Sequence, residues 1–176
     1  GMEVILKTFK DARMMDFCTP IVFGSSKVAS IHQKAIELQD FTFHNINNIS
    51  EAKANKVNLL NCWQEDIEIK FGAATATSGK YAFQSIKLAC SALKKEEVNV
   101  LVTAPINKAS IQEEISGFIG HTEFLQGNFE GESLMIMLSE NMKIAFVTGH
   151  IPLEQVKMTI TADKIISKTE QLNQSL

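Results

Sequence analysis

The segment that most constrains the fold covers residues 98–124 and reads VNVLVTAPINKASIQEEISGFIGHTEF. Its apolar, β-branched start at residues 98–102 is followed by Pro105 and predicts a short buried strand. Asn107 is then placed to cap a short helix that begins at Lys108. A strand followed closely by a helix is typical of α/β proteins, whose open sheets bind ligands beyond strand ends. The segment therefore predicts an α/β fold with a candidate phosphate position near Lys108.

The second half of this segment carries the other candidate binding groups. Gly117 and Gly120 make a flexible turn, and His121 and Thr122 follow it, so that an imidazole and a hydroxyl lie side by side. A lone histidine or a lone lysine at a helix start is more often structural or solvated than ligand-binding. Because they occur together after a predicted strand end, a binding role becomes about as probable as a structural one.

The remainder of the chain alternates between short apolar runs and helical patterns. Helices are expected at residues 3–17, 28–38 and 75–95, after Pro152, and from Thr161; strands are expected at residues 20–23, 41–46, 57–62, 66–70, 133–138 and 143–148. The last two strands are close enough in sequence to form an antiparallel hairpin. We therefore expect one domain over residues 1–176, with three α/β/α layers and a mixed, largely parallel sheet.

Composition and charge give no indication of several classes of partner and site. The net charge of −3, without a basic run, gives no reason to expect nucleic acid or an anionic membrane as a partner. No apolar run approaches the roughly 20 residues needed to span a bilayer. Cys18, Cys62 and Cys90 are odd in number and far apart, which indicates neither a disulfide framework nor a zinc knuckle. A reducing cytoplasm is the expected location.

Four motifs carry a resemblance to a known family. TAPINK, FIGHTEFL, MIML and VTGHIPLEQV follow one another in the order and spacing of the 4-hydroxythreonine-4-phosphate dehydrogenase family of vitamin B6 (pyridoxal phosphate) biosynthesis, which this chain resembles. The likeness extends over nearly the whole chain and includes PIVFGSSKVA near its start. The resemblance implies a fold similar to the isocitrate and isopropylmalate dehydrogenases.

The resemblance also implies functional residues and cofactors. It implies that His121 and Thr122 contact a phosphorylated substrate and that His150 is one ligand of a divalent metal such as zinc, magnesium or cobalt. The family uses NAD as hydride acceptor and places its active site between the subunits of a homodimer. Catalytic and NAD-binding residues of this chain are left unassigned.

The sequence departs from the family at both ends. It lacks a match to the extreme N-terminal strand and its glycine-rich turn, and to the C-terminal half that supplies the other metal ligands and most substrate contacts. No G-x-G-x-x-G turn replaces them. An incomplete form of the dehydrogenase is expected, with negligible activity alone. Two alternatives stay open: a phosphate acyltransferase of related fold, which coenzyme A-dependent acyl transfer would reveal, and a non-catalytic binding or dimerising module, which would fold without either activity.

Overall fold

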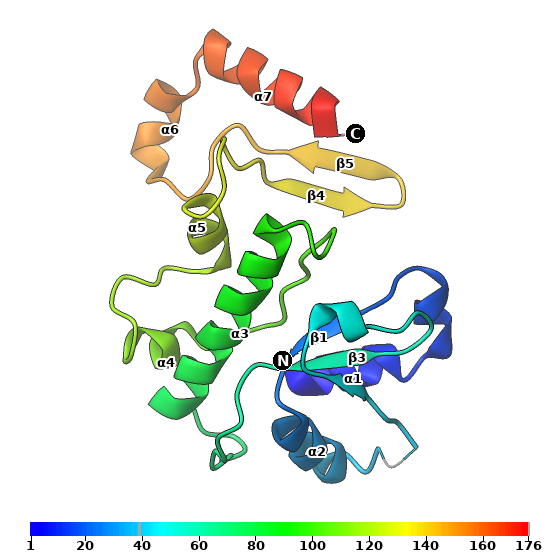
Figure 1. Ribbon diagram of the computed structural model, residues 1–176. Coiled ribbons are helices and arrows are strands. Elements are labelled where there is room, and N and C mark those ends of the chain that lie inside the picture. The colour runs from blue at the N-terminus through cyan, green and yellow to red at the C-terminus, as the bar shows by residue number, and fades with distance from the viewer. Residues whose placement is uncertain (39, 176) are drawn as a thin grey trace. The chain divides into compact units, whose positions relative to one another are not determined.

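The computed structural model describes residues 1–38 and 40–175 and divides into two compact units, Gly1–Phe129 and Glu130–Leu176 (Figure 1). Each unit contains its own sheet and its own helices. The expectation of one domain over residues 1–176 stays a prediction. None of the described helices is both long and apolar enough to cross a membrane.

The first unit is built on a parallel sheet of three strands in the order β1-β3-β2. The strands are β1 (Ile21–Gly24), β2 (His44–Ile46) and β3 (Asn58–Asn61). Asn58 and Leu59 of the central strand β3 are fully buried. The buried Asn58 side chain is hydrogen-bonded, because its Nδ2 donates to the carbonyl of Pro20 at 3.2 Å and its Oδ1 accepts from Lys53 N at 2.9 Å. This parallel sheet confirms the predicted α/β class.

The first unit also contains several helices, some of which pack against this sheet. They are α1 (Met2–Phe9), η1 (Ala12–Asp16), α2 (Ser26–Ala35), η2 (Ile49–Glu51), α3 (Ala76–Lys94), α4 (Lys108–Gln112) and α5 (His121–Gln126). α1 packs against α2, and α3 packs against β1. The core between sheet and helices consists of Leu6, Val22, Ala29, Leu38, Phe41, Val57 and Leu59.

Two local capping signals determine where helices begin. The helix expected over residues 3–17 is shorter, because Asp11 accepts a hydrogen bond from Arg13 N at 3.0 Å and starts the separate turn η1. The long helix α3 is confirmed. Its N-terminus is closed by a reciprocal pair in which Thr75 Oγ1 accepts from Ser78 N at 3.1 Å and Ser78 Oγ accepts from Thr75 N at 3.3 Å.

Two predicted strands are wrong. Residues 98–102 form no strand, and Val100 and Val102 are 74% and 87% exposed. Residues 66–70 also form no strand, and Asp66 instead makes an ion pair with Lys27 at 2.6 Å. In both segments the apolar pattern is present, but no neighbouring strand of the described residues supplies the ladder of hydrogen bonds that a strand requires.

The second unit begins with the predicted hairpin, which is confirmed. Its antiparallel strands β4 (Ile136–Ser139) and β5 (Met142–Ala145) pair from Ile136 with Ala145 to Ser139 with Met142. The sequence pattern placed this hairpin in the parallel sheet, whereas among the described residues it forms a two-stranded sheet of its own.

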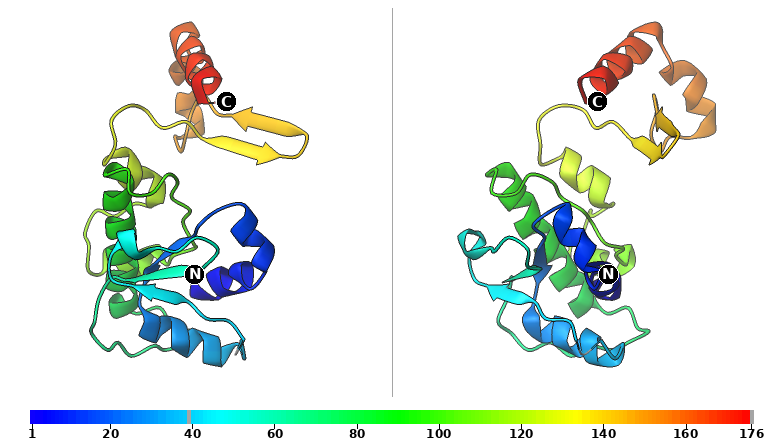
Figure 2. Two further views of the ribbon diagram at one scale, coloured as in Figure 1. Left: turned by 45° about the vertical axis from the view of Figure 1, so that its right-hand side comes forward. Right: turned by 90° about the vertical axis from the view of Figure 1, so that its right-hand side faces the viewer.

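Two helices follow the hairpin, as predicted: α6 (Leu153–Thr159) and α7 (Ala162–Ser175) (Figures 1 and 2). Lys168 of α7 connects this helix to the segment that precedes the hairpin. Its Nζ donates at 3.0 Å both to Glu132 Oε2 and to the carbonyl of Ser133. These contacts join the last helix to the segment before the hairpin, within the second unit.

Candidate functional site

The site is positioned by a close contact between two helices. α3 and α4 lie side by side in the views of Figure 2 and pack against each other through Gly79. A Cβ atom at Gly79 would lie 2.0 Å from the carbonyl oxygen of Ser110, which no real contact allows. The backbone of α4 can reach α3 only because residue 79 has no side chain. Ser110 and Ile111 are fully buried as a result.

The start of α4 is fixed by its predicted cap. Asn107 Oδ1 accepts a hydrogen bond from Ser110 N at 3.0 Å, so the helix begins at Lys108 as expected from the sequence. The cap and the buried contact at Ser110 together determine where Lys108 leaves the backbone.

The turn between α4 and α5 brings Lys108 next to the GHTE motif. A Cβ atom at Gly120 would lie 3.2 Å from Lys108 Nζ and 2.9 Å from Glu123 Oε2. Gly120 is buried, and its extended backbone is one that any residue can adopt. Glycine is therefore needed at this position because a side chain would collide with Lys108 and Glu123, and not because of its backbone angles. The ammonium of Lys108 therefore lies against the residue that immediately precedes His121.

Aromatic rings hold α5 on α3. Phe118 precedes the GHTE turn and Phe124 follows it, and both pack against Phe83 of α3 at centroid distances of 5.7 and 5.4 Å. Both contacts are nearly perpendicular, which is a favourable geometry for aromatic pairs. His121 and Thr122 thus lie between two anchored residues. Their helix α5 was not predicted, because the glycine-containing stretch before it indicated only a turn.

His121 is half-buried, and its ring has an unusual environment. Nε2 is inaccessible to solvent and has no hydrogen-bond partner among the described residues. Burial lowers the pKa of His121, and the positive charge of Lys108 lowers it further. The ring is consequently neutral at pH 7. A buried nitrogen without a partner is costly, which indicates that a further polar group belongs beside it.

The structure brings together two of the three predicted site residues. His121 and the exposed Thr122 are the first two residues of α5. His150 belongs to the second unit, where it is exposed between β5 and Pro152, the cap of α6. No three His, Cys, Asp or Glu side chains of the described residues are placed to hold a metal ion. These residues do not form a complete metal centre, and His150 can be one ligand of it at most.

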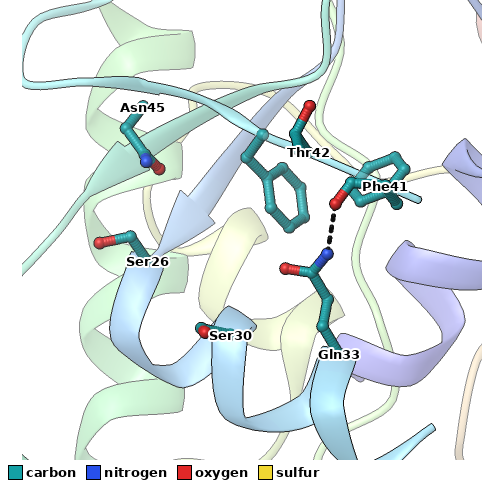
Figure 3. A pocket seen from close by; sticks show the side chains of 7 residues that line it. Ser26, Ser30, Gln33, Phe41, Thr42 and Asn45 are labelled. Atoms are coloured by element: carbon teal, nitrogen blue, oxygen red, sulfur yellow. Dashed lines mark hydrogen bonds between the residues drawn. The ribbon is translucent and has the colours of Figure 1, made fainter. Parts of the chain in front are cut away.

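A separate pocket of about 240 Å³ lies beside α2 (Figure 3). It is lined by Ser26, Ser30, Gln33, Phe41, Thr42, Phe43 and Asn45. Gln33 Nε2 donates to the carbonyl of Phe41 at 2.6 Å across it, as the dashed line shows. None of the predicted site residues lines this pocket, and no function is assigned to it from the sequence.

Comparison with known proteins decides the family. Residues 16–176 match the family model described as pyridoxal phosphate biosynthetic protein PdxA. The chain belongs to the PdxA family. It is 40% identical over 171 residues to 4-hydroxythreonine-4-phosphate dehydrogenase of Bacteroides thetaiotaomicron, covering 96% of this chain and 46% of that protein.

Two further proteins are similar to this chain. A Fusobacterium nucleatum protein provisionally named D-threonate 4-phosphate dehydrogenase is 29% identical over 180 residues, covering all of this chain and 54% of that protein. The crystal structure of a 4-hydroxythreonine-4-phosphate dehydrogenase from Burkholderia phymatum superimposes with a TM-score of 0.84 at 23% identity, covering 96% of this chain and 52% of that one. The chain spans about half the length of the curated relatives it matches. The predicted family and the dehydrogenase-like α/β fold are confirmed.

Sequence reasoning missed the glycines that assemble the site. From the sequence alone no role is assigned to Gly79, and Gly120 is described only as part of a flexible turn. Their role is to admit the Ser110 backbone and the Lys108 side chain, respectively. The available signal was a glycine inside a good helical pattern, which commonly marks a close packing contact.

Proposed function

We propose that this chain is part of an NAD-dependent dehydrogenase that oxidises a four-carbon phosphorylated hydroxy acid in pyridoxal phosphate biosynthesis. Membership of the PdxA family and 40% identity to a 4-hydroxythreonine-4-phosphate dehydrogenase support this activity. 4-Phosphohydroxythreonine is the first candidate substrate. The Fusobacterium relative makes D-threonate 4-phosphate the second.

The observation that carries the proposal is the environment of His121. Its buried Nε2 has no partner among the described residues, and the ammonium of Lys108 lies beside the preceding residue. In the proposal, Thr122 donates its hydroxyl hydrogen to a phosphate oxygen of the substrate. The neutral ring of His121 makes a second hydrogen bond to the substrate.

The cofactors are proposed from the family. A divalent metal, with zinc, magnesium and cobalt as candidates, would stabilise the alkoxide form of the substrate, and NAD would accept the hydride. His150 would supply one metal ligand. The resemblance to the family implies that the other metal ligands and most NAD contacts belong to its C-terminal half, and no three His, Cys, Asp or Glu side chains of the described residues are placed to hold a metal ion. The chain alone is therefore expected to turn over substrate negligibly.

We also propose that the chain forms a homodimer in a reducing cytoplasm. Leu134 and Ile136 of the hairpin segment are half-buried within the unit, and Met142 is 58% exposed. Their neighbours Met137 and Leu138 are 60% and 68% exposed. An apolar hairpin surface of this kind is suited to burial against a second subunit.

Complementation with a relative tests the activity. The matched segment of the Bacteroides enzyme would be replaced by this chain, and NADH formation measured by absorbance with each candidate substrate and added zinc or magnesium. The chimera is expected to form NADH with one of them and to lose that activity on His150→Ala, whereas the 176-residue chain alone is expected to be inactive. A folded chimera that forms no NADH from either substrate, beside an active parent enzyme, would contradict the proposal.

A further inference from the structure

We infer that Lys108 is a third substrate-binding residue, whose ammonium binds the phosphate that His121 and Thr122 contact. This inference rests on the proposed function and deepens it. The observation that carries the inference is the closeness of two segments, the starts of α4 and α5. Lys108 Nζ lies 3.2 Å from the point where a Cβ atom on Gly120 would be.

Three features of the fold direct Lys108 to this place. The Asn107 cap sets the first residue of α4. The absence of a side chain at Gly79 lets α4 pack on α3, and the absence of a side chain at Gly120 leaves room for the side chain of Lys108. Lys108 is an exposed residue, but the ammonium end of its side chain lies against the turn at Gly120. Its position against the turn is therefore a property of the fold.

The ammonium of Lys108 is available to a ligand. Within residues 1–38 and 40–175, its Nζ makes neither a hydrogen bond nor an ion pair within 4.0 Å. The carboxylate of Glu123 approaches the same point near Gly120 and is the nearest opposite charge there. Because an ammonium has three donors on a rotatable stem, it can turn from the neighbourhood of Glu123 to an incoming anion.

The proposed phosphate site needs the charge that Lys108 supplies. His121 is neutral and Thr122 carries no charge, so these two side chains offer hydrogen bonds but do not balance a phosphate dianion. Hydrogen bonds from an ammonium to a phosphate are roughly twice as strong as those between neutral groups. In this arrangement Lys108 balances the charge of the phosphate, while Thr122 and His121 fix its orientation.

A purely structural role for Lys108 gives different expectations. If the lysine only held the turn by attraction to Glu123, loss of either charge would lower the stability of the fold and leave anion binding unchanged. If the lysine binds phosphate, Glu123 competes with the anion. Removing the carboxylate would then strengthen phosphate binding, whereas removing the ammonium would weaken it.

The test is a titration of the 176-residue chain with inorganic phosphate, followed by NMR at the amides of residues 120–123. Lys108→Gln is expected to weaken binding by about tenfold or more, as loss of a charge-assisted hydrogen bond does. Glu123→Gln is expected to strengthen it. Lys87→Gln is the matched control, since it removes the same charge from an exposed position of α3 in the same unit and should leave binding unchanged.

Gly120→Ala provides a second variant that keeps every charge. Its methyl group would take the space next to Lys108 Nζ and Glu123 Oε2, so phosphate binding is expected to weaken although the lysine is present. Lys108→Arg retains a positive charge and is expected to restore most of the binding lost in Lys108→Gln. This rescue also separates a binding defect from a folding defect.

The outcomes separate this inference from the proposed function. If wild-type protein shows no phosphate-dependent shifts at residues 120–123, the phosphate site and the role of Lys108 in it are overturned, and NADH formation by the chimera decides the proposed function separately. If wild-type protein binds phosphate, Thr122→Val weakens that binding, and Lys108→Gln binds as wild type does, then the site stands and the assignment of Lys108 is overturned.

Discussion

Gly79 of α3 and Ser110 of α4 form the tightest backbone approach to any glycine of the described chain, since a Cβ at Gly79 would lie 2.0 Å from the Ser110 carbonyl oxygen. The obstacle is backbone rather than the end of a flexible side chain, so it cannot move aside without displacing α4. The position of Lys108 at the start of α4 therefore depends on residue 79.

Gly79→Ala is expected to lower the free energy of unfolding by about 1–3 kcal/mol, because overpacking a well-packed contact forces the backbone to shift. Urea unfolding followed by circular dichroism measures the change. Gly149→Ala is the matched control, because nothing lies within 4 Å of the added methyl group there. Equal stability of the two variants would show that α3 and α4 do not pack as described.

The stability of the fold should depend on pH through His121. Burial lowers the pKa of this histidine below its ordinary value of 6.5. As pH falls through 6.5, the unfolded chain takes up a proton that the folded chain does not, so the free energy of unfolding decreases. His121→Gln is expected to reduce that decrease between about pH 7 and pH 5. An identical pH dependence in wild type and variant would contradict the buried, neutral ring.

His32 adds a second contribution of the same sign. Its pKa is lowered chiefly by burial, and its ring packs edge-on against Phe71 at 5.0 Å. The single His32→Gln variant is therefore expected to behave like His121→Gln, and the double variant to lose still more of the pH dependence. The lowered carboxyl pKa of Asp11, at about 2, acts only at much lower pH.

The three thiols should differ in reactivity. Burial raises the pKa of the Cys62 thiol to about 12 and also raises the pKa of the buried Cys90, whereas Cys18 is exposed. Since the thiolate is the reacting form, a thiol reagent at about pH 8 is expected to modify Cys18 first. Counting modified thiols with Ellman's reagent tests this order. A fast phase that survives Cys18→Ser would show that one of the other two thiols is accessible.

Local signals made two helix starts predictable. Asn107 and Thr75 cap helices that begin where expected, because a cap depends only on residues two or three positions away. The strand expected at residues 98–102 is wrong for the opposite reason. An apolar, β-branched run indicates a suitable strand, but the partner that would pair with it is set by the tertiary fold.

The candidate site was predictable only in part. His121 and Thr122 are neighbours in the sequence, so their proximity needed no structure. The approach of Lys108 to Gly120 joins two segments separated by the whole of α4 and the following turn, and it depends on a contact at Gly79 whose partner, the backbone of Ser110, no local pattern specifies. Periodicity reports which side of a helix is buried, but it does not report what backbone lies against it.

The proposed dimer has a direct test in light scattering. At micromolar concentration the chain is expected to have about twice its 19.5 kDa monomer mass. Leu138→Asp places a charge on the exposed hairpin and is expected to give the monomer mass, whereas Val102→Asp, at an exposed position of the first unit, should not. A monomer mass for the wild-type chain would contradict the proposal.

Calorimetric titration with 4-phosphohydroxythreonine tests most directly the central claim, that His121 and Thr122 bind a phosphorylated substrate. The wild-type chain is expected to bind this compound and to bind 4-hydroxythreonine, which lacks only the phosphate, far more weakly. The double variant His121→Ala, Thr122→Val is expected to lose the preference for the phosphorylated compound while keeping its fold by circular dichroism. Equal binding of the two compounds by the wild type, or an unchanged preference in the double variant, would contradict the account.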